Sequence, residues 1–140
     1  MIQQLDQVQD LAAYRISKAR ECYSDAQAAL MEQRYSTAAN RSYYAIFHAV
    51  RALLAFGKFD SKRHSTIIGY FHREYIATGK IPREYHLILT EAFHMRMETD
   101  YNDFFVISRE ETDEQVSKAL VFIEYIEVVI AGLQVPAQNN

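Results

Sequence analysis

The sequence predicts an all-α protein, an antiparallel up-down bundle of about five helices. Glycine and proline are scarce, with four and two copies in 140 residues, so few positions interrupt a helix. Apolar residues recur at spacings of three and four along most of the chain, which is the period of an amphipathic helix. We therefore expect one helical domain over residues 1–134, followed by a disordered tail over residues 135–140.

The first two helices are expected over about residues 5–33 and 36–57. Ser36 is the expected N-cap of the second helix, because a serine hydroxyl can accept a bond from a free backbone N–H there. Gly57 is its expected stop. The connection between the two helices is short, which favours an antiparallel hairpin.

Three further helices complete the predicted bundle. The third is expected over about 65–77 and the fourth over about 83–99. Residues 100–107 are the least regular part of the chain and are expected to cross back over the bundle. The fifth helix then begins at Ser108, which forms a Ser-x-x-Glu capping box with Glu111.

Composition narrows the class of protein. A single cysteine, Cys22, rules out an internal disulfide and fits a reducing compartment. No segment has the form of a secretory signal, and no apolar run reaches the roughly 18 residues that a membrane span needs. We therefore expect a cytoplasmic protein with no membrane partner.

Charge is distributed unevenly along the chain. Residues 58–83 hold six Arg or Lys against two Asp or Glu, whereas residues 84–140 hold three against eleven, and the formal net charge is −3. An acidic total argues against indiscriminate nucleic-acid binding, yet a local basic region can still guide a polyanion to one site. The basic region contains Lys58, Lys62, Arg63, His64 and Arg73, which could form either a rim that guides a polyanion or a solvated loop.

The second predicted helix carries Arg41 and His48 seven positions apart. Seven residues are close to two helical turns, so these side chains fall within roughly 20° of each other on one face. Small residues accompany the pair at helical spacing: Thr37, Ala38, Ala45, Ala52 and Ala55. The opposite face is large and apolar and should meet the core: Tyr43, Ile46, Phe47, Val50, Leu53 and Leu54.

The small residues around Arg41 and His48 suggest that this helix face meets a second surface. A solvated face normally carries Lys, Glu and Gln, and an Arg and a His can share such a face by chance. Alanines beside an arginine instead suit a closely packed interface, in which a buried charge needs a partner or a task. We therefore expect this face to turn toward a second subunit.

Other kinds of site are not indicated. The five histidines show no pair at i, i+4 with an intervening Glu, and no second cysteine exists for a structural zinc site. The chain also has no glycine-rich phosphate loop and no nucleophile elbow. We expect neither a metal nor another cofactor.

Two runs of residues resemble a known family. Asn-Arg-x-Tyr-Tyr-Ala-x-Phe-His at 40–48, followed by Ala-x-Arg-Ala-Leu-Leu at 49–54, resembles the signature of HEPN domains (higher eukaryotes and prokaryotes nucleotide-binding). In that signature an Arg and a His are separated by four to six residues, and the gap here is six. Arg-x-x-x-Asp-Tyr at 96–101 resembles an element that follows the fourth helix in one prokaryotic branch. The resemblance covers roughly residues 10–133.

The resemblance implies a bundle that dimerises so that the Arg/His helices of two subunits face each other. For active members it also implies metal-independent RNA cleavage, often as the toxin of a toxin–antitoxin pair whose antitoxin is a small nucleotidyltransferase. Arg41 and His48 are then the expected catalytic residues. A histidine can exchange a proton with a ribose 2′-hydroxyl or a leaving 5′-oxygen near neutral pH, and an arginine can stabilise the charged phosphate. The expected product is a 2′,3′-cyclic phosphate.

Three neighbouring residues are expected to contact the RNA. Asn40 could orient a phosphate or the histidine, Tyr44 could hydrogen-bond to a base or stack on it, and Arg51 could bind a neighbouring phosphate. For Tyr44, simple packing at a helix–helix flank is an equal alternative. The chain departs from the better-described toxin branch at Val50, where that branch has the tyrosine that the antitoxin modifies.

Two other functions remain open from the sequence. One is a non-catalytic HEPN module that binds a nucleotide or a nucleotidyltransferase partner and uses the same face for dimerisation. The other is a purely structural helical-bundle adaptor.

Overall fold

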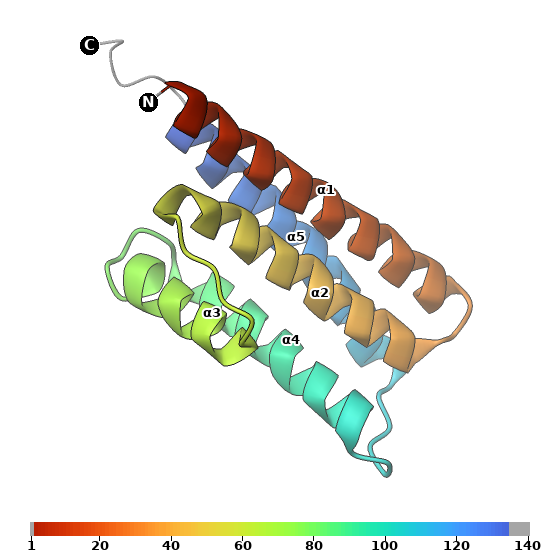
Figure 1. Cartoon of the computed structure of the whole chain (residues 1–140). Helices are drawn as coiled ribbons and strands as arrows, with labels where there is room; N and C mark the ends of the chain where they lie inside the picture. The colour runs from red at the N-terminus through yellow and green to blue at the C-terminus, as the bar shows by residue number, and fades with distance from the viewer. Residues whose placement is uncertain (1, 135–140) are drawn as a thin grey trace.

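The computed structural model describes residues 2–134, and among these every regular element is helical. α1 (Ile2–Met31) and α2 (Tyr35–Leu54) form a long hairpin, and a 3-10 turn, η1 (Ala55–Gly57), continues α2. Figure 1 shows the two helices running side by side in opposite directions. The all-α prediction and the antiparallel pairing of the first two helices are confirmed. The predicted tail at 135–140 lies outside the described residues.

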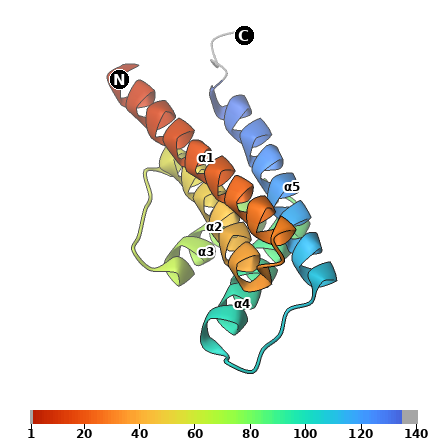
Figure 2. The ribbon, with the colours of Figure 1, turned by 90° about the vertical axis from the view of Figure 1, so that its right-hand side faces the viewer.

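The second half of the described chain returns along the hairpin. α3 (His64–Phe71) continues into a π-helical turn, η2 (His72–Ile76), and is followed by α4 (Arg83–Tyr101) and α5 (Arg109–Gln134). α2 packs against α1, α3, α4 and α5, so it is the central helix of the bundle. Figures 1 and 2 show α1 on one side of α2 and the α3–α4 pair on the other, with α5 alongside α1 and α2.

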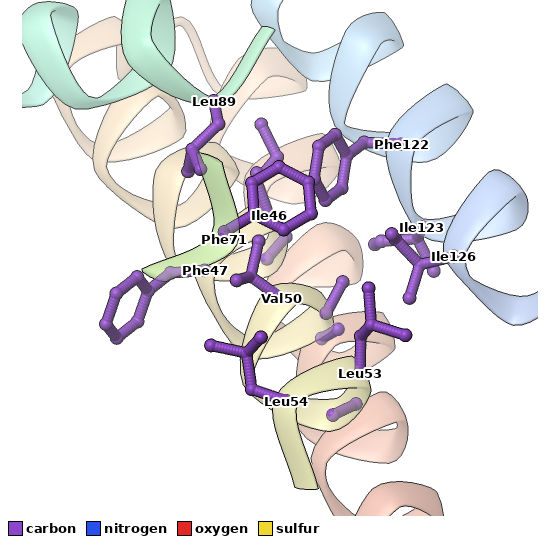
Figure 3. Packing of buried hydrophobic residues seen from close by; sticks show 14 of the residues in the cluster. Ile46, Phe47, Val50, Leu53, Leu54, Phe71, Leu89, Phe122, Ile123 and Ile126 are labelled. Carbon is purple, nitrogen blue, oxygen red and sulfur yellow. The ribbon is translucent and has the colours of Figure 1, made fainter. Parts of the chain in front are cut away.

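The apolar face of α2 forms the centre of the core. Figure 3 shows Ile46 and Leu53 of α2 directed toward Phe122 and Ile126 of α5. All six residues predicted to face the core are buried: Tyr43, Ile46, Phe47, Val50, Leu53 and Leu54. Burial of one such large side chain contributes roughly 1.5–3 kcal/mol. This face therefore fixes which way α2 is rotated in the bundle.

α1 and α2 pack against each other, and each carries a series of buried alanines, which we infer to line this contact and call the alanine seam. Each series repeats every seven residues, and all six side chains are at most 1% exposed: Ala12, Ala19, Ala26, Ala38, Ala45 and Ala52. In an antiparallel hairpin the two series run past each other. Because alanine adds only a methyl group beyond the backbone, the helix axes can approach closely along the whole seam.

The seam corrects one expectation from the sequence. Small residues beside Arg41 and His48 were expected to face a second subunit, but Ala38, Ala45 and Ala52 are completely buried within this chain. Ala55 is 4% exposed, and of the five small residues only Thr37 reaches solvent. The sequence pattern correctly indicated a close approach, but the expected partner, a second subunit, was wrong. The small residues pack against α1 of the same chain.

Local boundaries also differ from expectation at two places. α2 begins at Tyr35 and its N-cap is Arg34, which makes no capping side-chain bond, so Ser36 is not the cap. The third predicted helix is α-helical only to Phe71, after which the chain continues as η2. At α5 the prediction holds: Glu111 N–H donates to Ser108 Oγ at 3.0 Å, and Ser108 N–H donates to Glu111 Oε1 at 3.1 Å.

The alanine seam should tolerate no larger side chain. Ala19→Leu places three extra carbon atoms where Ala19 is fully buried, so we expect the free energy of unfolding to fall by about 1–3 kcal/mol. Ala13→Leu is the matched control, since Ala13 is exposed on the same helix. Urea denaturation followed by circular dichroism measures both variants. Equal stability of the two would contradict tight packing at the seam.

Candidate functional site

α2 has one accessible stripe. From Ala38 to Ala55 every residue is buried except five, and these five are half-buried. They are the residues predicted from the sequence to form the site: Asn40, Arg41, Tyr44, His48 and Arg51. The structure thus places all five together along one side of the central helix. Their role in binding or catalysis stays a prediction.

A cleft of about 500 Å³ lies between this stripe and α1. Arg41, His48 and Arg51 form its α2 wall. The α1 wall contributes more residues than α2 does: Leu11, Tyr14, Arg15, Lys18, Glu21, Cys22 and Asp25. Four cationic side chains and a histidine therefore face two carboxylates, so the cleft carries an excess of positive charge that favours an anionic ligand.

His48 is poised as a base in this setting. Partial burial lowers the pKa of His48, and the positive charges of Arg51, Lys18, Arg41 and Arg15 lower it further. The imidazole is therefore neutral at neutral pH and can accept a proton. Its Nδ1 is buried and has no hydrogen-bond partner among the described residues, which leaves Nε2 as the nitrogen that can exchange a proton with a ligand.

Asn40 holds Arg41 in place. Arg41 donates to Asn40 Oδ1 through Nε at 3.1 Å and through Nη2 at 2.7 Å. Asn40 in turn donates through Nδ2 to Asp100 of α4 at 3.1 Å. The amide of Asn40 is thus already used on both sides. In this structure Asn40 positions the arginine and makes no hydrogen bond to His48; orienting the histidine was one of the two roles predicted for it.

The Asp100 carboxylate joins the second sequence element to the site. Arg96 Nε donates to Asp100 Oδ2 at 3.1 Å, within the Arg-x-x-x-Asp-Tyr run. Because both residues belong to α4, the hydrogen-bonded link from Asp100 to α2 passes through Asn40. Tyr44 lies between the two arginines, with the Arg41 and Arg96 guanidinium carbons 5.1 and 5.4 Å from its ring centre. Tyr44 is therefore fixed by cation–π contacts within the chain.

Arg51 is paired with a residue that the sequence did not single out. Its Nε and Nη2 donate to the two oxygens of Asp60, at 3.1 and 2.7 Å, in a two-pronged ion pair. Arg15, only 8% exposed, donates to Asp60 Oδ2 at 3.1 Å and to the Arg51 main-chain carbonyl at 2.9 Å. The hydrogen bond from Arg51 is the main reason that the pKa of Asp60 lies below its ordinary value.

Sequence reasoning missed Arg15, Lys18 and Asp60. A signal for Arg15 was present, because it lies three residues after Ala12 and four before Ala19 and so falls on the seam face of α1. A charged residue at such a position needs a partner. Nothing in the sequence indicated that Asp60, on the connection after η1, would be that partner.

A family model of the HEPN domain matches residues 12–129 of this chain. The chain belongs to the HEPN family. It is 32% identical to a UPF0332 protein of Thermotoga maritima over 130 residues, which cover 93% of this chain and 98% of that protein. Two Methanocaldococcus jannaschii proteins that bear the name putative toxin are 29% and 31% identical, over 77% and 79% of this chain and 74% and 82% of their own lengths.

Two kinds of feature are not found in the described part of this HEPN domain. Within the described part of the chain, no three His, Cys, Asp or Glu side chains gather closely enough to hold a metal ion. No helix between residues 2 and 134 combines the length and the apolar character needed to cross a membrane.

The Asn40–Asp100 contact should stabilise the HEPN domain measurably. Asp100→Ala removes the acceptor shared by Asn40 and Arg96, so we expect the free energy of unfolding to fall by about 1 kcal/mol. Asp103→Ala is the control, because Asp103 is exposed on the following loop; its effect should stay within about 0.5 kcal/mol. If the two variants unfold at the same denaturant concentration, the Asp100 network contributes nothing.

The cationic setting of His48 should be visible by NMR. We expect its Cε1–H signal to titrate below the ordinary histidine value of about 6.5. Lys18→Gln removes one of the charges that lower the pKa of His48, so the pKa should rise in this variant. Lys80→Gln, which removes a charge outside the cleft, should leave it unchanged. A pKa of His48 at or above the ordinary value would contradict this electrostatic account.

Proposed function

We propose that this HEPN domain is a metal-independent endoribonuclease, the toxin of a toxin–antitoxin pair, in which Arg41 and His48 are catalytic. The observation that carries the proposal is the cleft between α1 and α2, where both residues share one cationic cavity. The names of the two Methanocaldococcus relatives support a toxin role. The substrate is RNA, because the chemistry available to a histidine and an arginine without a metal requires a 2′-hydroxyl as the nucleophile.

In the proposed reaction His48 and Arg41 have different roles. Neutral His48 accepts the proton of the 2′-hydroxyl through Nε2, and the 2′-oxygen attacks the adjacent phosphorus. The bond from phosphorus to the 5′-oxygen then breaks. Arg41, held from behind by Asn40, donates to the phosphate oxygens as negative charge develops on them. The products are a 2′,3′-cyclic phosphate and a 5′-hydroxyl.

The leaving 5′-oxygen needs a proton, and a homodimer would supply it. In the proposed dimer the clefts of two copies face each other, and His48 of the partner subunit acts as the acid in the minority of dimers in which it carries a proton, because the pKa of His48 is low. Leu11 and Tyr14 support this arrangement, because they line the cleft and remain 42% and 60% exposed. Exposed apolar side chains at a cleft edge are suited to a protein contact. The antitoxin partner in this proposal is a small nucleotidyltransferase.

A second candidate is a non-catalytic module that binds a nucleotide or a nucleotidyltransferase. The ion pair between Arg51 and Asp60 favours this candidate. Because the charge of Arg51 is already neutralised within the chain, this arginine is less available to a reacting phosphate. A module that only binds has no need for a neutral histidine beside several cations. The shared cleft of His48 and Arg41, whose guanidinium is held only by the neutral Asn40 amide among the described residues, therefore favours catalysis.

Cleavage of RNA in excess EDTA tests the proposal. We expect the wild-type protein to cut RNA, and Arg41→Ala and His48→Ala each to lower the rate by about 10²–10⁴-fold. The matched controls are Arg34→Ala and His94→Ala, which remove the same residue types from exposed positions outside the cleft and should cut normally.

The products distinguish the remaining alternatives. Cyclic phosphate ends and 5′-hydroxyl ends support the mechanism. Activity that survives both substitutions, or that disappears with the chelator, would overturn it. Nucleotide binding without cleavage by the wild-type protein would favour the non-catalytic module.

A further inference from the structure

A second cavity of about 610 Å³ adjoins the catalytic cleft, and we call it the Lys62 pocket. It is lined by Phe47, Arg51, Asp60, Ser61, Lys62 and His64. Arg51 lines both cavities, so the Lys62 pocket continues the accessible stripe of α2 beyond the cleft. Its outer wall is the connection between η1 and α3, which Figure 1 shows crossing beside α2.

His64 is held in one orientation and one tautomer. The hydroxyl of Tyr43 lies 2.7 Å from His64 Nδ1, and the imidazole stacks on Phe47 with ring centres 4.2 Å apart. Tyr43 is completely buried, and its burial raises the pKa of the phenol. The phenol therefore keeps its proton, and because the Tyr43 hydroxyl has no other hydrogen-bond partner among the described residues, we assign it as the donor and Nδ1 as the acceptor. Neutral His64 then carries its own proton on Nε2, which makes Nε2 a hydrogen-bond donor.

The only carboxylate in the pocket has no acceptor capacity to spare. Asp60 Oδ1 accepts from Arg51 Nε at 3.1 Å and from the Ser61 N–H at 2.9 Å. Asp60 Oδ2 accepts from Arg15 and Arg51 at 3.1 and 2.7 Å. Its charge is balanced by two arginines. Asp60 therefore fixes the wall of the pocket and does little to repel an anion.

The groups left for a ligand are donors. Lys62 is exposed and makes no ion pair among the described residues. Ser61 Oγ accepts from the Arg63 N–H at 3.1 Å, so its hydroxyl proton remains free to be donated. Together with His64 Nε2–H, these donors suit a phosphate, which has only acceptors.

We propose that the Lys62 pocket binds a second phosphate of the RNA strand, next to the phosphate held at Arg41 and His48. The inference rests on the proposed function for its choice of RNA. Its own support is the shared Arg51 wall, because adjacent cavities suit adjacent phosphates of one strand. The substrate class that follows is a single-stranded oligonucleotide with at least two phosphates, in preference to a dinucleoside monophosphate.

Lys62→Gln tests the contact on substrates that differ by one phosphate. The probes are UpU, which has one phosphate, and two trinucleotides, which have two phosphates. Each trinucleotide contains a single ribonucleotide, so only one of its linkages can be cleaved. We expect Lys62→Gln to lower kcat/KM by about tenfold on at least one trinucleotide and to leave kcat/KM on UpU unchanged. Lys62→Arg should restore the trinucleotide rate. Lys80→Gln, outside the pocket, should behave as wild type.

Salt dependence gives an independent readout. Loss of one phosphate contact should reduce the slope of log affinity against log salt by about 0.7 for a single strand. Affinity is measured by fluorescence anisotropy on labelled all-deoxy di- and trinucleotides, which cannot be cleaved, so this contact is visible even if the protein cuts no RNA. An equal loss on one- and two-phosphate ligands, or no loss on either, would overturn the inference. Absence of cleavage with a preserved difference in binding would overturn only the proposed function.

Discussion

The alanine seam between α1 and α2 is the constraint on which the site depends. Long side chains at its positions would separate the two helices, and the wall formed by Arg15 and Lys18 would move away from Arg41 and His48. Because the seam repeats every seven residues on both helices, it also fixes how each is rotated. The accessible stripe of α2 is thereby directed along the edge of the seam, where residues of α1 can reach it.

The close approach of α1 and α2 also determines the electrostatics of the cleft between them. It gathers four cationic side chains around one histidine, an arrangement that opposes folding unless counter-charges are present. Asp60 supplies one such charge, and Glu21 and Asp25 lie on the α1 wall of the cleft. Asp60 binds Arg15 and Arg51, and among the described residues Arg41 has no carboxylate partner. Arg41 is held instead by the neutral amide of Asn40, so its positive charge stays available to a ligand.

The sequence predicts those features that lie within one helix. Periodicity located all five helices, the Ser108–Glu111 spacing identified a cap, and the spacing of Arg41 and His48 placed them on one stripe. Features that join distant segments were not predictable in this way. The partner of Arg15 is 45 residues away in sequence, and the partner of Asn40 is 60 residues away. The alanines show the limit clearly, because their pattern indicates a close contact but does not say with which helix.

The six-residue gap between Arg41 and His48 also bears on how such a protein could be silenced. In a HEPN sequence with a four-residue gap, the histidine falls five positions after the arginine, and a tyrosine two residues later falls seven positions after it. Residues seven positions apart lie on the same face of a helix, so that tyrosine would lie on the same face as the arginine. In this chain the residue seven positions after Arg41 is His48. Val50 points instead toward the core and is fully buried. A tyrosine at position 50 would therefore be inaccessible to a modifying enzyme, so the antitoxin proposed above would have to act through a different residue or by covering the cleft.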